Sequence, residues 1–306
     1  MLSEITSFLS TDIRTATSIM ICAIGLVFSS KAGIVNIGAE GMMLMGAFMG
    51  VMGSYLMGNV WFGVLFAMLS AMLIALVFAY FTVTLKADQT VVGTAINTLA
   101  LGLTSTFSRI FFGMNAAPPK IDSFAPIALP LLSKIPALGP SLFTQPIPVY
   151  ILYAIIPIAF FVLYKTNLGL QIRAVGENPR ASDTVGVNVY RIRYGTILFS
   201  GLLSGFGGVF SSLGLLSFFT ENMIAGRGFM AVAAVVFGKY NPLGVMGASL
   251  LFGAGEALKY RLQATNTGIP FQFLIMMPYL LTVLALCGFA GKPKEPKDLG
   301  NPYRAE

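Results

Sequence analysis

The sequence predicts an all-α protein that crosses a membrane several times. Hydrophobic residues make up 56% of the 306 positions and charged residues only 10%, a balance far from that of soluble domains. The mean hydropathy is +0.81, and the 33 glycines suit close contacts between helices in lipid. Apolar runs of about 20 residues, the length that spans about 30 Å of hydrocarbon, recur along the chain. A water-soluble protein is therefore excluded, and we expect a polytopic integral membrane protein.

Nine segments are candidates for transmembrane or partly re-entrant helices. They lie near residues 13–30, 39–58, 61–84, 89–112, 147–164, 194–219, 227–238, 243–260 and 270–289. The seventh offers only about a dozen apolar positions, which suits a re-entrant or half helix better than a full crossing. The parity of the helix count depends on this segment.

Basic residues predict the orientation, because lysine and arginine gather in cytoplasmic loops. Two basic segments, the loop over 165–193 and the tail over 292–306, are both expected inside. Nine crossings place them on one side together with Lys31, Lys86 and Lys239. This arrangement leaves the N-terminus outside, with twelve of the 19 basic residues in the cytoplasm. The net charge of +7 thus has a topological explanation, and no nucleic acid partner is expected.

The predicted domain plan is one transmembrane domain over residues 1–291, followed by the cytoplasmic tail. Its long external loop, 113–146, contains six prolines before residue 146. Proline disfavours helix and favours extended or turn conformations, so we expect this loop to lie against the membrane. It is either a docking surface for a partner or only a connector.

Missing residue types exclude several kinds of chemistry. The chain has no histidine, so it forms no Ser-His-Asp triad, Cys-His pair or histidine metal site. Cys22 and Cys287 both fall in apolar stretches and are expected to be buried thiols. The fragment Gly288-Phe-Ala-Gly-Lys-Pro lacks the upstream glycine and the Ser or Thr of a phosphate-binding loop. We expect no cofactor on this chain, so ATP would have to act on another protein.

The cytoplasmic loop contains the start and stop signals of a short helix. Asn178 is a good N-cap, and Pro179 is favoured at the first helical position, where its missing N–H forfeits no bond. Gly186 supplies the stop, since glycine adopts the left-handed conformation without a Cβ penalty. The helix between them has about two turns and is too short to be stable in water alone.

Something must therefore hold this helix, and two interpretations stay open. It is a coupling helix seated in a cleft of a cytosolic ATPase, with Glu177, Arg180 and Asp183 available for charge-assisted contacts, or an ordinary solvated loop with a capped turn. The first interpretation makes this loop the point at which an ATP-driven movement reaches the membrane domain.

A second distinctive segment, KAGIVNIGAEGMMLMGA over residues 31–47, combines several glycines with Asn36 and Glu40. This composition suggests a broken or re-entrant start of the second span. An acid at membrane depth is costly and normally pairs, faces a cavity or holds neighbouring backbone. We favour a structural pin for Glu40 over a substrate ligand.

Polar side chains within the spans are candidates for lining a translocation path. They are Asn36, Glu40, Asn97, Thr98, Ser204 and Glu256. Glu256 has an alternative role, which is a salt bridge with Lys259 or an interfacial position near a helix end. Glycines spaced by four predict close helix packing; they are Gly46 and Gly50 in the second span and Gly201 and Gly205 in the sixth.

The segments GIVNIGAEGMMLMGAF and AVGENPRASDTVGVNVYRIR resemble the signature and coupling segments of a known family. These are the permease subunits of ATP-binding-cassette (ABC) importers for branched-chain amino acids, ribose and nucleosides. Two later stretches, 226–238 and 241–248, match this family too. NIGAEG followed by GENPRASDTVG is most similar to purine-type nucleoside importers served by a lipid-anchored basic membrane protein. The modest length resembles the smaller of the two permeases in those systems.

The resemblance implies a bacterial plasma-membrane importer in which this chain does no catalysis. Its partners would be a cytosolic ATPase that uses ATP and Mg, a larger permease, an extracytoplasmic lipoprotein that binds the substrate, and membrane lipid. The coupling role would fall on the residues that match the family's segment: Glu177, Asn178, Pro179, Arg180, Ala181, Ser182, Asp183 and Gly186.

The substrate expected from the resemblance is a nucleoside, moved by alternating access. Ribose or another sugar and branched-chain amino acids are the competing substrates within the same class of importer. An ion-coupled secondary transporter that uses Glu40 and Glu256 is a second class of function, which would depend on an ion gradient rather than on ATP.

Overall fold

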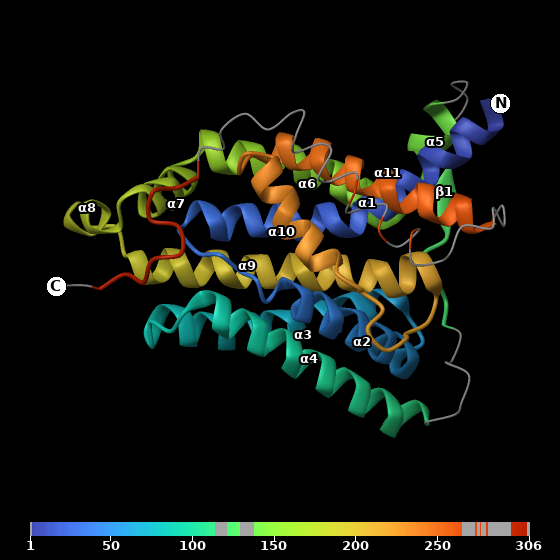
Figure 1. The fold of residues 1–306 in the computed structure, drawn as a ribbon, viewed down its shortest axis with the longest axis horizontal. Coiled ribbons are helices and arrows are strands. Elements are labelled where there is room, and N and C mark those ends of the chain that lie inside the picture. Colours follow the sequence, from blue (N-terminus) through green and yellow to red (C-terminus); the bar gives the residue numbers. More distant parts are fainter. Residues whose placement is uncertain are drawn as a thin grey trace.

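The computed structural model describes residues 2–113, 121–128, 138–264 and 295–304, together with three positions between 272 and 281. Long helices dominate the described residues, and most of them run along the longest axis of the molecule (Figure 1). The described C-terminal segment lies at one end of this bundle and the N-terminus at the other (Figure 1).

Helix α1 (Leu2–Lys31) forms the centre of the bundle, because 94% of the residues in its most apolar stretch are buried. It packs along α11 (Pro242–Ala264) and along α9 (Val189–Val209), which continues into the π-helical turn η2 (Phe210–Leu216). Helix α2 (Ala39–Met57) packs against α9 as well. The core is therefore built from elements of both halves of the chain.

Three further helices lie outside this core: α3 (Val60–Ala79) with its π-helical end η1 (Tyr80–Thr84), α4 (Gln89–Phe112) and α6 (Ile147–Lys165). Among the described residues, α1, α3, α4, α6 and α9 are long and apolar enough to cross a membrane. The prediction of an all-α membrane protein is confirmed. The ninth predicted segment, 270–289, lies almost wholly outside the described residues.

Glycines let α2 and α9 approach each other closely, as their four-residue spacing predicts. A Cβ atom placed on Gly46 would lie 2.6 Å from the Cα of Gly205, and one on Gly50 would lie 2.3 Å from a methyl carbon of Val209. Neither distance is compatible with a larger residue unless the backbone moves. The contact therefore fixes the spacing between the two helices.

The long external loop has its own local structure in its described parts. Strand β1 (Pro126–Ala128) pairs antiparallel with β2 (Thr144–Pro146), which directly follows the short helix α5 (Leu138–Phe143). The all-α prediction misses this small ladder, although extended backbone is what prolines favour. Arg14 of α1 donates from Nε to the side-chain oxygen of Gln145 at 2.8 Å, so the ladder is fastened to the central helix.

The seventh predicted span contains only a half helix, preceded by turns. Its helix, α10 (Arg227–Phe237), has 11 residues and is only about 16 Å long, roughly half of the hydrocarbon thickness. The turns that precede it begin at Ser217, whose carbonyl accepts from the N–H of Ile121 in the external loop. Beyond α10, the ring of Tyr240 lies 5.8 Å from the ammonium of Lys31 at the far end of α1. Turns and half helix together thus connect the two ends of the bundle.

The end of the bundle opposite the N-terminus gathers the segments that the charge count expects in the cytoplasm. These are α7 (Asn167–Glu177), α8 (Pro179–Thr184) and the C-terminal segment 295–304. The N–H of Asp298 donates to the carbonyl of Gly176 at 3.0 Å, and that of Gly300 donates to the carbonyl of Gly33 at 3.0 Å. The C-terminal segment is therefore bound directly to α7 and to the turn after α1.

Candidate functional site

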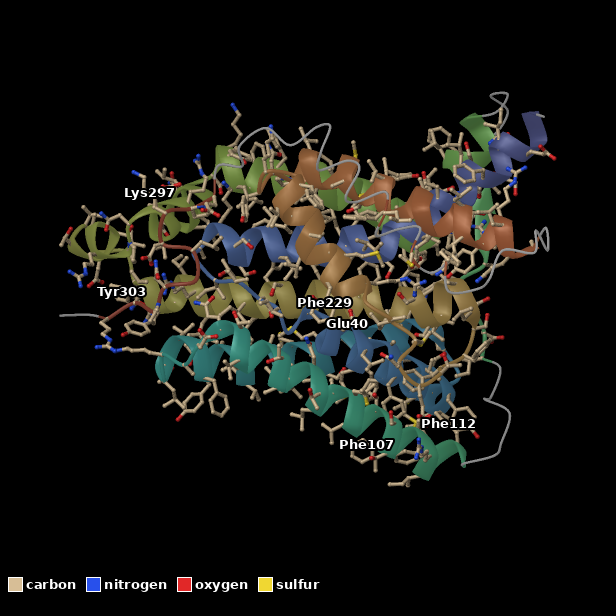
Figure 2. The ribbon with its side chains drawn as sticks, viewed as in Figure 1. Glu40, Phe107, Phe112, Phe229, Lys297 and Tyr303 are labelled. Carbon is tan, nitrogen blue, oxygen red and sulfur yellow. The ribbon has the colours of Figure 1, made fainter. Side chains whose placement is uncertain are left out.

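Glu40 holds the first turn of the half helix α10. One carboxylate oxygen accepts from the N–H of Gly226 at 2.8 Å, and the other accepts from the N–H of Gly228 at 2.6 Å. These groups are at the helix N-terminus, where a negative charge is favourable. Glu40 is only 9% exposed, and Figure 2 shows it beside Phe229 in the middle of the bundle. Glu40 therefore holds the backbone of a neighbouring helix in place, which is the structural role favoured for it from the sequence.

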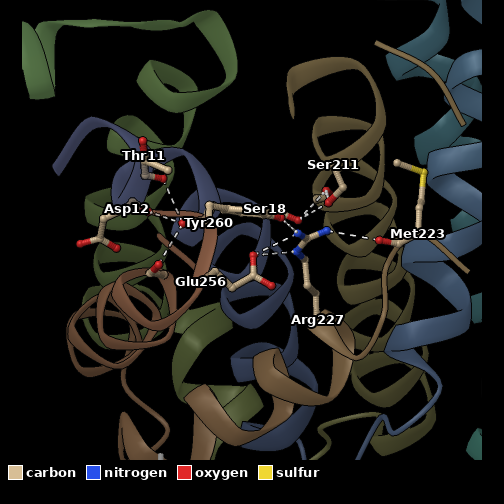
Figure 3. A network of polar contacts seen from close by, with 11 residues as sticks. Thr11, Asp12, Ser18, Ser211, Met223, Arg227, Glu256 and Tyr260 are labelled. Carbon is tan, nitrogen blue, oxygen red and sulfur yellow. Dashed lines mark hydrogen bonds and ion pairs between the residues drawn. The ribbon is translucent and has the colours of Figure 1, made fainter. Parts of the chain in front are cut away.

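A second buried acid fastens the same turn to α11. The Arg227 guanidinium lies 3.0 Å from the Glu256 carboxylate, and both side chains are almost fully buried. The guanidinium also donates to the hydroxyl of Tyr260 at 3.1 Å and to the carbonyl of Met223 at 3.3 Å (Figure 3). Glu256 therefore pairs with Arg227, whereas Lys259, its expected alternative partner, lies over the Tyr260 ring at 4.8 Å.

Two asparagines bind the glycine-rich start of α2. The side chain of Asn97 accepts from the N–H of Gly41 at 2.8 Å and donates to the carbonyl of Ile37 at 3.1 Å. Asn36 donates to the hydroxyl of Ser200 on α9 at 2.9 Å. Asn97 on α4 thus bonds two backbone groups at the helix start, as a helix end inside a membrane requires, whereas Asn36 ties this start to a side chain of α9.

The remaining two path candidates lie in different surroundings. Ser204 is buried between α1 and α9, where its hydroxyl donates to the carbonyl of Ser200 at 2.7 Å and lies 3.2 Å from the sulfur of Cys22. Thr98 is exposed on α4 and donates to the carbonyl of Thr94 at 3.1 Å. Of the six candidates, Thr98 is exposed, Asn97 is half-buried and the other four are buried.

The short helix α8 starts and stops as its sequence predicts. The Asn178 side chain accepts from the N–H of Ala181 at 3.1 Å, Pro179 is the first helical residue, and Gly186 has a φ of 85°. The outer surface is formed by Glu177, Asn178, Arg180, Ala181, Asp183 and Gly186, whereas Pro179 and Ser182 are buried. The helix thus presents both signs of charge on one accessible turn.

The C-terminal segment steadies α8 and the start of α9. Tyr303 donates from its hydroxyl to Asp183 at 2.8 Å and packs edge-on against the ring of Tyr190 at 5.7 Å. The guanidinium of Arg193, which is 1% exposed, lies 2.7 Å from the carboxylate of Asp298. Sequence signals predict the ends of α8 but not this support, because the partners lie more than 100 positions apart in the chain.

A polar cavity of about 340 Å³ opens between α8 and the C-terminal segment. Figure 2 shows Lys297 and Tyr303 at this end of the molecule. The cavity is lined by Glu177, Asn178, Pro179, Arg180, Lys297, Asp298, Pro302, Tyr303 and Arg304. Close by, burial raises the pKa of Tyr240, and the charge of Glu295 adds to the effect. The region around α8 is thus a polar surface at one end of an otherwise apolar bundle.

Sequence reasoning missed the two buried arginines. Arg227 lies in an expected external position and Arg193 in a basic loop, yet both are almost completely buried in ion pairs. The signal that was available for Arg227 is its place at the start of a half helix, where a neighbouring acid is needed to balance its charge.

A helical membrane bundle with a broken crossing, a mostly paired polar interior and a capped helix on its polar end is the architecture of a transport subunit. The chain belongs to the family described as branched-chain amino acid transport system / permease component, which it matches over residues 8–286. Its members are permease subunits rather than enzymes, and the chain is a multi-pass plasma-membrane protein.

Relatives with known names are similar along almost the full length. The guanosine ABC transporter permease protein NupQ of Bacillus subtilis is 41% identical over 94% of this chain and 93% of its own length. The nucleoside ABC transporter permease protein NupC of Lactococcus lactis is 38% identical over the same shares. A second guanosine permease of Bacillus subtilis, NupP, is 24% identical over 92% of this chain and 82% of its own length.

Proposed function

We propose that this chain is the membrane permease subunit of an ATP-driven importer of nucleosides. The observation that supports this function best is the match of 94% of the chain to relatives named as guanosine and nucleoside ABC transporter permeases. Nothing in the polar clusters of the described residues resembles a set of catalytic groups, since each cluster fastens one helix to another. A permease of an importer therefore agrees with the names of the relatives and with polar clusters that join helices.

The proposed complex contains more than this chain. A cytosolic ATPase would bind ATP and Mg, an extracytoplasmic lipoprotein would deliver the nucleoside, and a second, larger permease would complete the membrane part. The second permease is supported by the match to NupP, because one bacterium has two different permease proteins named for guanosine.

We propose that α8 is the contact with the ATPase. Its exposed charges, Arg180 and Asp183, lie on a helix that is already capped by Asn178 and held by Tyr303. A preformed contact loses less conformational entropy on docking than a loop that must fold first.

Movement of α8 would reach the membrane core through two connections. The first is α9, which is separated from α8 by four residues and packs along α1, α2 and α3. The second is the C-terminal segment, because Asp298 bonds both Arg193 on α9 and the backbone at Gly176 on α7. A rigid-body shift of these elements is the type of movement that alternating access needs.

Charge reversal on α8 tests the coupling role. Arg180→Glu or Asp183→Arg should reduce guanosine uptake and transport-coupled ATP hydrolysis at least tenfold, while the amount of permease in the membrane stays the same. Lys165→Glu, an exposed charge reversal at the end of α6, is the matched control and should transport normally. Normal transport by both α8 variants would contradict the proposed contact.

Two alternatives are separated by simpler assays. A relative named as a putative glucose ABC transporter permease is 31% identical over 91% of this chain, so unlabelled sugars and branched-chain amino acids should be compared with nucleosides as competitors of uptake. An ion-coupled transporter is disfavoured because Glu40 and Glu256 both have partners within the chain. Uptake that continues after ATP depletion but stops when an ionophore is added would instead support an ion-coupled secondary transporter.

A further inference from the structure

Helix α4 breaks the rule that lipid-exposed helices are the most apolar ones. Among the three outer helices, the most apolar stretch of α3 has a mean hydropathy of 2.6 with 39% of its residues buried, and that of α6 has 2.3 with 33% buried. The corresponding stretch of α4 has a mean hydropathy of only 1.2, although just 22% of it is buried. A helix that faced lipid over this much of its surface should be as apolar as α3.

The exposed side of α4 carries a row of small residues between larger apolar ones such as Leu99 and Leu101. Thr94, Thr98, Gly102 and Thr106 follow one another in steps of four residues, and all four are exposed; we name them the α4 stripe. At 100° per residue, this face lies roughly opposite the buried residues of the helix. Those buried residues are Gly93, Ile96, Ala100 and Thr104.

The α4 stripe is a shallow surface, and the hydroxyls of Thr94 and Thr98 on it bond the backbone of α4 itself. A Cβ atom placed on Gly102 would meet nothing within 4 Å. Thr94 donates to the carbonyl of Val91 at 2.9 Å and Thr98 donates to that of Thr94 at 3.1 Å, so these hydroxyls already have backbone acceptors. The stripe is thus a shallow track of small residues along a helix.

The outer face of α3 shows what a lipid-facing surface of this protein looks like. Its exposed residues are Trp61, Phe62, Leu65, Leu69, Leu73, Leu76, Val77 and Tyr80. Large apolar side chains at these positions suit contact with acyl chains. Threonine and glycine in four-residue steps instead suit the close approach of another transmembrane helix.

The position of α4 leaves room for such a helix. It packs mainly on α2 and has few neighbours in α3, and its C-terminal half leans away from the bundle (Figure 1). Phe107 and Phe112 mark this outlying part in Figure 2. At that end, Arg109 pairs with Glu221 at 2.7 Å, which ties the helix to the turns before α10.

We propose that the α4 stripe is the surface on which a transmembrane helix of the second permease subunit packs. This inference rests on the proposed function, which supplies a second permease of the same family. The second permease is favoured over another copy of this chain because NupQ and NupP are different proteins with the same named substrate in one bacterium. Thr98, expected to line the translocation path, then lies at the junction of the two permeases.

Cysteine cross-linking in membranes that contain the complete importer tests the proposal. In a background with Cys22→Ala and Cys287→Ala that still transports, we would compare Thr98→Cys and Gly102→Cys on α4 with Leu69→Cys and Leu73→Cys on α3. A short bismaleimide should join the α4 variants to the second permease, as identified by mass spectrometry, and should leave the α3 variants unlinked. An adduct between two copies of this chain, linkage from α3 instead of α4, or no linkage from α4 would overturn the proposal.

A steric block provides an independent test. Gly102→Leu adds a side chain to a face that is open within this chain, so the subunit should fold normally but retain at least tenfold less of the second permease on purification. Gly247→Leu, on α11 and equally open within the chain, is the matched control.

These outcomes separate the two proposals. Wild-type protein that purifies from intact membranes without an ATPase or a second permease would count against the importer function itself. A wild-type complex that forms, combined with full recovery of the second permease by Gly102→Leu, would leave the importer intact and refute the α4 interface.

Discussion

The two short helices α8 and α10 start in opposite ways. Helix α8, with six residues, is capped by Asn178, which lies directly before it and accepts from the N–H three residues later. Helix α10, with 11 residues, follows Gly226, which has no side chain to cap it. Its N–H groups are bonded by Glu40, 186 positions earlier in the chain.

This difference reflects the surroundings of the two helices. Water solvates the backbone groups that α8 leaves open, so a local cap is enough. The first turn of α10 lies in the apolar interior, where an unbonded N–H costs several kcal/mol, and its partner must come from a neighbouring helix. Helix α10 is therefore fastened to α2 and α11, whereas α8 keeps one face exposed and is held by Tyr303 at its Asp183. Four substitutions test this contrast, in order of decreasing effect.

The largest effect is expected from breaking the buried ion pair of α10. Arg227→Met alone leaves the Glu256 carboxylate buried without a cation and should lower the free energy of unfolding by about 3–5 kcal/mol. Arg227→Met combined with Glu256→Leu removes both charges and should recover most of that loss. Unfolding of the purified complex, followed by fluorescence, measures both. Equal destabilisation by the single and double variants would show that packing, rather than charge, holds this turn.

The next largest effect is expected from removing the long-range cap. Glu40→Ala leaves the N–H groups of Gly226 and Gly228 without their acceptor, at a cost of about 2–3 kcal/mol, and should reduce uptake at least tenfold. Glu4→Ala removes a more exposed acid whose partner, Arg261, is also partly exposed, and serves as the control. The same melting curve for Glu40→Ala and wild type would contradict the capping role.

A smaller loss is expected from crowding the same junction. A Cβ atom on Gly228 would lie 2.4 Å from the Cα of Glu40, so Gly228→Ala must separate α10 from α2, at about 1–3 kcal/mol. Gly247→Ala places the same methyl group in open space on α11 and should be neutral or slightly stabilising. The comparison of the two melting temperatures isolates the steric effect from helix propensity.

The smallest effect on the bundle is expected at α8. Asn178→Ala removes one local cap and should destabilise the helix by about 1 kcal/mol, without changing the unfolding of the membrane domain. Hydrogen exchange of residues 179–184 should rise, and transport should fall two- to fivefold. Asn178→Ser retains an acceptor at the cap and should restore both. A large drop in the stability of the whole protein would show that α8 is part of the core.

The sequence predicted the local features of this fold well. The cap at Asn178, the stop at Gly186 and the close packing at the glycines of the second and sixth spans depend on neighbours within a few residues or on residue size alone. That these two spans pack on each other was not predicted. The polar residues within the spans were recognised as exceptional, but their partners were not. For Glu256 the sequence offered the translocation path or, as an alternative, a salt bridge with Lys259, because a single sequence shows only nearby partners; the structure pairs it with Arg227 on another helix.

By itself, the sequence determined that the chain is an integral membrane protein, that its helices pack through small residues, and that a capped helix lies in the basic loop it predicts to be cytoplasmic. Those conclusions follow from composition, periodicity and local hydrogen bonding, which act over a few residues. Only the tertiary structure decided which acid serves α10, which face of α4 is left open and how the C-terminal segment supports α8. Such choices depend on distances between segments more than 100 positions apart, because a buried charge or N–H group is stabilised by whichever partner the packed helices bring to it.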